Sequence, residues 1–125
     1  MRVLVDTSVW VDHFRAGNAT LAALLGSDRV LVHPLVLGEI ACGTPPSRER
    51  TLRDLGRLQP APQATLREVL GFVEQHRLFG LGCGFIDINL LASTLLTPGV
   101  EVWTLDKRFG ALAERFGVLH CPTLH

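Results

Sequence analysis

The chain has 125 residues, of which 47% are hydrophobic, and its 12 basic and 12 acidic residues give a formal net charge of zero. This length fits one domain with a real core, spanning residues 1–125, and the apolar fraction excludes a disordered chain. Neutral charge gives no indication of a nucleic-acid binder, which is often basic. No apolar run approaches the ~20 residues of a membrane span and no signal-peptide pattern opens the chain, so we expect a cytoplasmic protein without membrane contact.

The first predicted strand covers residues 2–6 and ends in Asp6. Its short, β-branched apolar run is typical of a strand buried on both faces. Helical spacing follows over residues 8–16 and again over 20–25, before a second apolar strand at 29–33. Strands that alternate with helices predict an α/β fold with a central parallel sheet.

The next predicted helix, residues 34–43, is almost wholly apolar except for Glu39. A glutamate is rarely buried without a partner, so we expect Glu39 to lie among apolar neighbours with a group that binds its carboxylate. The alternative is that this helix is only partly buried and that Glu39 faces water.

A polar helix is predicted over residues 47–58, with Ser47 as its N-cap. Arg50, Arg53 and Arg57 fall at i, i+3 and i+7 and share one face of this helix. Such a face could contact RNA phosphates or simply be solvated, and we favour the solvated face.

An amphipathic helix is predicted over residues 64–79, with Leu66, Val69, Leu70 and Val73 pointing inward. The glycine-rich segment 80–84 follows. It lacks the lysine and spacing of phosphate-binding loops, so we expect its glycines to let the chain pass close to another element.

Two more acids stand at the beginnings of the last predicted helices. Asp87 lies in the first turn of the apolar helix 85–96, and Asp106 ends the strand 101–106 and precedes the helix 107–116. A helix-capping role explains each of these positions, and Asp6 likewise. Asn89 and Ser93 share one face of helix 85–96 and could bind a ligand or face solvent. A last short strand is predicted at 118–121.

Four acids share one property, which is that each ends an apolar strand or lies in an apolar helix: Asp6, Glu39, Asp87 and Asp106. The carboxyl ends of parallel strands lie at one edge of a sheet, where α/β proteins bind ligands. Like charges gathered there require a reason, and a bound cation is the usual one. Carboxylate oxygens suit Mg²⁺, and a carboxylate-bound metal suits phosphodiester hydrolysis.

The chain resembles PIN-domain proteins, and among them the VapC-type toxins of toxin–antitoxin pairs. The resemblance rests on four motifs in order, which are Val-Asp6-Thr-Ser-Val-Trp, Glu39 in the helix after the second strand, Gly82-x-x-x-x-Asp87-x-x-Leu-Leu-Ala92 and Thr104-Leu-Asp106-Lys-Arg-Phe109. It implies a three-layer α/β/α sandwich. It also implies an acidic catalytic site formed by Asp6, Glu39, Asp87 and Asp106, with hydroxyls from Thr7 or Ser8 and from Thr104 nearby.

The resemblance further implies Mg²⁺- or Mn²⁺-dependent cleavage of RNA, with Asp6 and Asp87 as the principal metal ligands. The expected partners are an RNA substrate, an antitoxin protein that blocks the acidic site, and a second copy in a homodimer. Two alternatives stay open. One is a PIN-like module that binds RNA or protein without cleaving, and the other is a receiver-like domain, which normally needs paired acids after its first strand.

Overall fold

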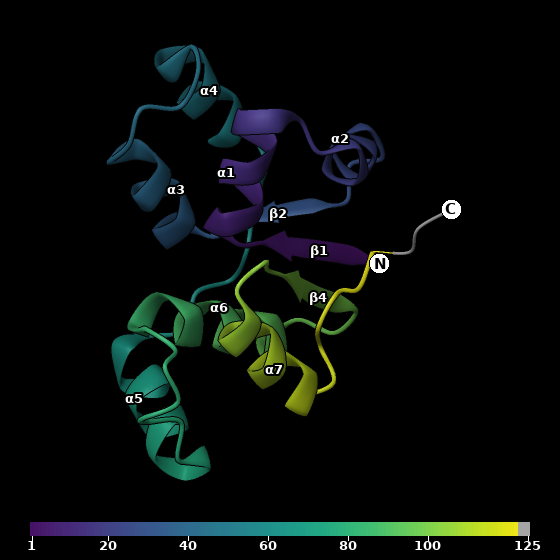
Figure 1. The fold of residues 1–125 in the computed structure, drawn as a ribbon. Coiled ribbons are helices and arrows are strands. Elements are labelled where there is room, and N and C mark those ends of the chain that lie inside the picture. Colours follow the sequence, from purple (N-terminus) through teal and green to yellow (C-terminus); the bar gives the residue numbers. More distant parts are fainter. Residues whose placement is uncertain (123–125) are drawn as a thin grey trace.

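The computed structural model describes residues 1–122, and they form three layers with a parallel sheet between two groups of helices (Figure 1). Every strand pair is parallel, and the spatial order is β3-β2-β1-β4. The predicted α/β/α sandwich is therefore confirmed. The strands are β1 (Arg2–Val5), β2 (Val30–Val32), β3 (Gln59–Pro60) and β4 (Val100–Trp103).

Helices cover both faces of the sheet, with α1 to α4 on one side and α5 to α7 on the other (Figure 1). Both faces of the inner strands are thus removed from water, which explains their unbroken apolar runs. The helices are α1 (Thr7–Ala16), α2 (Ala19–Gly26), α3 (Pro34–Ala41), α4 (Arg48–Leu55), α5 (Leu66–His76), α6 (Phe85–Leu96) and α7 (Lys107–Arg115).

Strand β1 lies in the middle of the described sheet, and Val3, Leu4 and Val5 are each at most 1% exposed. Leu4 is in register with Leu31 of β2 and with Val102 of β4. The two strands that are followed by acids, β1 and β4, are therefore neighbours. Their carboxyl ends lie at the same edge of the sheet.

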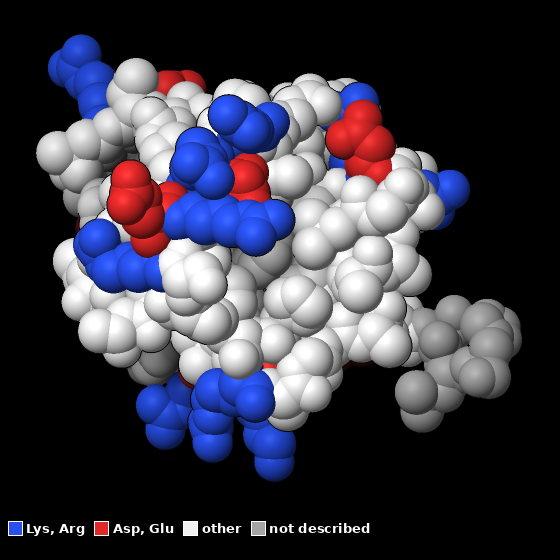
Figure 2. All heavy atoms as spheres, turned by 90° about the horizontal axis from the view of Figure 1, so that it is seen from above, with Lys and Arg blue, Asp and Glu red and all other residues white. Residues whose placement is uncertain are grey.

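The arginine face predicted on helix 47–58 is wrong in its extent. Helix α4 ends at Leu55, so Arg57 lies outside it, and Ser47 has a left-handed backbone with φ of 46° and makes no side-chain cap bond. Arg50 Nε lies 3.9 Å from Asp54 Oδ2, and both side chains are exposed. Figure 2, which views the molecule from above Figure 1, shows basic side chains interspersed with acidic ones on this face. The solvated alternative fits this arrangement.

Helix α5 is shorter than predicted and buries only part of its apolar stripe. Val69 is fully buried, whereas Leu66 and Leu70 are 61% and 53% exposed, so their predicted inward position is wrong. Helix α5 packs on α6 along one side. The stripe is wider than the surface available to cover it, which leaves the two leucines in water.

Three smaller differences concern the strands. Residues 59–60, where no strand was predicted, form the edge strand β3, and β4 ends at Trp103 rather than at residue 106. The predicted strand 118–121 is reduced to a single bridge between Val102 and Leu119.

None of the helices within residues 1–122 combines the length and the apolar character needed to cross a membrane.

Candidate active site

Asp6 directly follows β1 and is only 6% exposed. Its Oδ1 accepts a hydrogen bond from the Thr7 N–H at 2.8 Å, and its Oδ2 accepts from the Ser8 and Thr104 hydroxyls at 2.8 and 2.7 Å. A carboxylate offers about four lone-pair positions, and three are used here. Oδ1 is therefore the Asp6 oxygen that retains capacity for a ligand.

The turn after β4 is held against α1 by the same hydroxyls. The Leu105 N–H donates to Ser8 Oγ at 3.0 Å, and the Asp106 N–H donates to Thr104 Oγ1 at 3.0 Å. Asp106 Oδ1 accepts from the Phe109 N–H at 2.9 Å and caps α7, while the residue stays exposed. These bonds fix Asp106 at the same edge of the sheet as Asp6.

Glu39 lies in the last turn of α3 and is exposed, so the expectation that it is surrounded by apolar groups is wrong. Helix α3 buries the face formed by Val36 and Ile40, and Glu39 projects from the neighbouring face. The expected partner does exist. The Thr7 hydroxyl donates to Glu39 Oε1 at 2.7 Å, which connects α3 to the beginning of α1.

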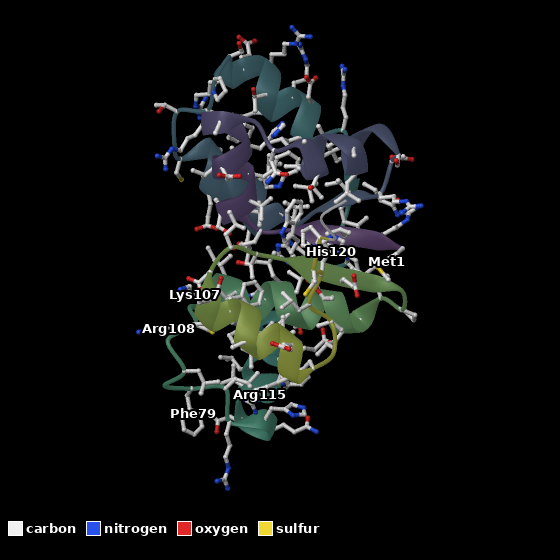
Figure 3. The ribbon with its side chains drawn as sticks, turned by 45° about the vertical axis from the view of Figure 1, so that its right-hand side comes forward. Met1, Phe79, Lys107, Arg108, Arg115 and His120 are labelled. Atoms are coloured by element: carbon white, nitrogen blue, oxygen red, sulfur yellow. The ribbon has the colours of Figure 1, made fainter. Side chains whose placement is uncertain are left out.

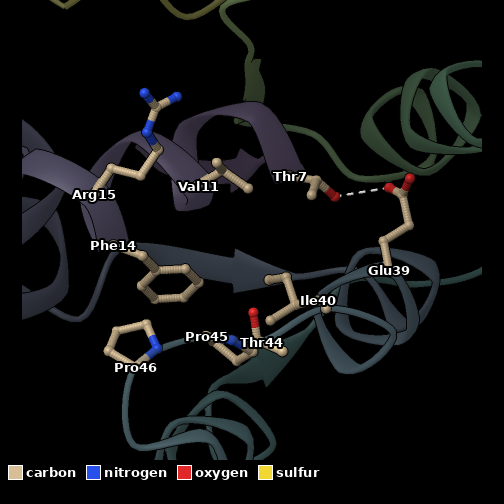
Figure 4. A pocket seen from close by; sticks show the side chains of 10 residues that line it. Thr7, Val11, Phe14, Arg15, Glu39, Ile40, Thr44, Pro45 and Pro46 are labelled. Carbon is tan, nitrogen blue, oxygen red and sulfur yellow. Dashed lines mark hydrogen bonds between the residues drawn. The ribbon is translucent and has the colours of Figure 1, made fainter.

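A groove of about 330 Å³ runs between α1 and the end of α3 (Figure 4). Phe14 and Ile40 contribute apolar walls, Thr7 and Glu39 lie at one end, and Arg15 lies toward the other. The acidic edge of the sheet thus continues into a mostly apolar depression.

Asp87 is half-buried in the first turn of α6, where its Oδ2 accepts from the Gly84 N–H at 3.2 Å. Burial is the largest of the effects that raise the pKa of Asp87 to about 6. The charges of Asp6, Asp106 and Glu39 raise this pKa further, and the Gly84 bond opposes the rise. The Asp87 carboxylate therefore senses all three other predicted site residues.

The four acids share one electrostatic neighbourhood without forming a single ligand shell. Within residues 1–122, no three His, Cys, Asp or Glu side chains are placed to hold a metal ion together. The capping interpretation is confirmed for Asp6, Asp87 and Asp106, each of which accepts a bond from a backbone N–H at the start of its helix. These three aspartates thus cap their helices and also belong to the acidic cluster.

The polar face of α6 does not face solvent, so that alternative is wrong for Asn89 and Ser93. Asn89 is 7% exposed and donates from Nδ2 to the Phe85 carbonyl at 2.9 Å. Ser93 is 1% exposed, and its hydroxyl has no hydrogen-bond partner in the described part of the chain. Both side chains belong to the packing of α6 rather than to a solvent face.

Cys83 and Arg108 lie beside the acids and were not predicted as site residues. Burial raises the pKa of the Cys83 thiol, as do Asp87 and Asp106, whereas Arg108 lowers it. The thiol thus lies near both carboxylates and the guanidinium. The position of Arg108 directly after the Asp106-Lys107 pair was the available signal.

No protein-family model matches the chain. Two curated proteins do, both called ribonuclease VapC32, from Mycobacterium tuberculosis strains CDC 1551 / Oshkosh and ATCC 25618 / H37Rv. Each is 46% identical to this chain over 116 residues, covering 93% of this chain and 94% of the relative. At this identity and coverage, the chain belongs to the VapC family, of which ribonuclease VapC32 is a member.

Proposed function

We propose that this protein is a divalent-metal-dependent endoribonuclease with a PIN-like fold, acting as the toxin of a toxin–antitoxin pair. The observation that carries the proposal is the gathering of Asp6, Glu39 and Asp106 around the half-buried Asp87 carboxylate, whose pKa is raised first by burial and then by the charges of these three acids. Gathered like charges are relieved by a bound cation. The name of the VapC32 relatives supports RNA as the substrate.

Mg²⁺ or Mn²⁺ would be the cofactor, with Asp6 and Asp87 as its principal protein ligands. Mg²⁺ prefers oxygen ligands, keeps several waters and is commonly held by one or two carboxylates, so it does not need a three-residue shell. The free capacity of Asp6 Oδ1 fits this requirement. The ion would supply Lewis acidity toward the phosphate and lower the pKa of the attacking water.

Glu39 and Asp106 would accept a proton from the attacking water. A cation competes with the proton of Asp87, so metal affinity should rise as the pH rises through the pKa of about 6. Glu39 Oε1 is occupied by Thr7 and Asp106 Oδ1 by the Phe109 N–H, so Glu39 Oε2 and Asp106 Oδ2 are the oxygens placed to accept a proton. Both residues are exposed and accessible to the attacking water.

An antitoxin and a second copy of this chain are the proposed protein partners. The groove that ends at Thr7 and Glu39 supports the first, because a segment lying in it would cover the acidic edge. The exposed leucines of α5, Leu66 and Leu70, support the second, because exposed apolar side chains on one helix favour association.

The test is cleavage of labelled small RNA by the purified, antitoxin-free protein with Mg²⁺, with Mn²⁺ and with chelator. We expect discrete fragments that require the metal and disappear in Asp6→Asn. The matched control is Asp54→Asn, an exposed acid on α4. Cleavage that persists in Asp6→Asn would contradict the site assignment and indicate a contaminating nuclease.

The alternative is a PIN-like module that binds RNA or protein without cleaving. Folded protein that binds RNA but yields no fragments with any divalent ion would favour it. The same cellular phenotype in Asp87→Asn as in the wild type would also favour the non-cleaving module.

A further inference from the structure

Arg108 lies directly on the glycine-rich loop before α6. A Cβ added to Gly82 would lie 2.6 Å from both Cδ and Nη1 of Arg108 and 3.1 Å from its Cζ. Only a glycine allows this contact, and its φ of 79° also favours glycine. Figure 3 labels Arg108 close to this loop and next to Lys107. The close approach expected for the glycine loop is therefore made by the Arg108 side chain.

The Arg108 guanidinium has no protein acceptor in the part of the chain that the structure describes. The arginine side-chain hydrogen bonds in residues 1–122 are those of Arg48, and the arginine ion pair is that of Arg50 with Asp54. Arg108 is exposed. One side of the Arg108 side chain lies against Gly82, and its planar set of N–H donors remains available to a ligand.

Arg108 lies at the border of the acidic cluster. Its charge acts on the Cys83 thiol, on which Asp87 and Asp106 also act. Arg108 and Lys107 also begin α7, where the helix dipole favours anions over cations. Lys107 and Arg108 are thus two cations at the rim of the acidic cluster, where an anionic ligand can approach from outside.

We propose that Arg108, positioned by its contact with Gly82, binds an RNA backbone phosphate beside the cleaved one. A guanidinium matches phosphate through two parallel hydrogen bonds, and an acidic cluster alone repels RNA. The exposed Phe79 at the start of the same loop adds a surface on which a base can stack. This inference rests on the proposed function for the identity of the ligand.

The test measures binding of a short fluorescein-labelled, single-stranded RNA of mixed sequence by anisotropy, in an Asp87→Asn background that does not cut it. We expect Arg108→Ala to weaken binding about 10-fold. It should also reduce the slope of log Kd against log salt by about 0.7, the value for one lost phosphate contact on a single strand. Arg108→Lys should keep the slope and lose part of the affinity. Arg115→Ala, an exposed arginine at the other end of α7, is the control.

A second pair of variants tests the role of Gly82 separately from backbone strain. Gly82→Ala must displace Arg108 and should weaken RNA binding as Arg108→Ala does, with no further loss in the double variant. Gly80→Ala carries similar strain, with φ of 70°, but its added Cβ meets nothing within 4 Å, so RNA affinity should not change.

Unchanged RNA affinity and an unchanged salt slope in Arg108→Ala would overturn the inference. This holds even if the same variant binds the antitoxin more weakly. Equal effects of Gly82→Ala and Gly80→Ala would overturn the positioning role of Gly82. If the wild-type protein binds RNA through Arg108 but never cleaves it, the proposed nuclease activity is refuted. The proposed contact of Arg108 with an RNA phosphate is then still supported. Wild-type protein that binds no RNA would refute both.

Discussion

Asp87→Asn should stabilise the metal-free protein at neutral pH, even though it removes a predicted metal ligand. Ionised Asp87 is half-buried and lies within range of the charges of Asp6, Glu39 and Asp106. Asparagine is uncharged and nearly isosteric, and its side-chain oxygen can still accept the bond from the Gly84 N–H. The substitution therefore removes the electrostatic penalty and keeps the helix cap.

The size of the effect follows from the pKa of Asp87, which rises from an ordinary 3.8 to about 6. A shift of roughly two units corresponds to about 3 kcal/mol as an upper limit. Because Asp87 is partly exposed, solvent screening reduces this to roughly 1–2 kcal/mol. We expect Asp87→Asn to raise the free energy of unfolding by that amount near pH 7.

The pH dependence has a definite sign. Between pH 3.8 and about 6, folded Asp87 binds more protons than unfolded Asp87, so its contribution to stability falls as pH rises through this window. The gain from Asp87→Asn should thus be absent near pH 4 and complete by pH 7. Burial lowers the pKa of His33, which acts in the opposite direction but titrates in both proteins and cancels in the difference.

Urea unfolding of both proteins with chelator, at a series of pH values, measures this difference. Added Mg²⁺ should stabilise the wild type more than Asp87→Asn, because a ligand that binds only the folded state stabilises it. A metal-free Asp87→Asn protein that is less stable than the wild type at pH 7 would refute the reasoning. So would a difference that does not vary between pH 4 and 7.

The remaining predictions concern single side chains. Thr104→Val removes a donor to buried Asp6 and should lower the free energy of unfolding by about 1–3 kcal/mol, and metal affinity measured by calorimetry should fall about 10-fold or more. Stability that depends on His33 should be lost as pH falls below about 6.5, and His33→Asn should flatten this part of the urea-derived pH profile. Val69→Ala should cost about 1–3 kcal/mol in urea unfolding, whereas exposed Leu70→Ala should cost less than about 0.5.

The strands β1 and β4 could be predicted because their short apolar runs are typical of strands buried on both faces, whereas their pairing required the structure. The two-residue strand β3 could not, because Gln59 and Pro60 carry no apolar signal. It pairs along the sheet edge, where proline is tolerated, and the following Ala61 N–H donates to the Val32 carbonyl at 2.8 Å. Edge strands of this kind depend on tertiary pairing and not on local sequence.

The exposure of individual side chains was predicted less well than their proximity. The sequence places Glu39 in an apolar helix, but it does not indicate which face of that helix another element covers. The same limit explains Leu66 and Leu70, which lie on an apolar stripe that is only partly covered. The choice of the four acids and the approximate positions of β1, β2 and β4 could be derived from the chain, whereas the contact of Arg108 with Gly82 required the structure.

Helix capping and an acidic site began as alternative explanations for the same aspartates, and the fold makes them compatible. Parallel strands followed by helices place carboxyl ends of strands and N-termini of helices at one edge. Asp6, Asp87 and Asp106 therefore lie at the positive ends of α1, α6 and α7. Each helix end stabilises a nearby anion by about 0.3–1 kcal/mol. This offsets part of the repulsion without removing it, since the pKa of Asp87 stays raised, so the metal-free fold can persist and still gain stability from a cation.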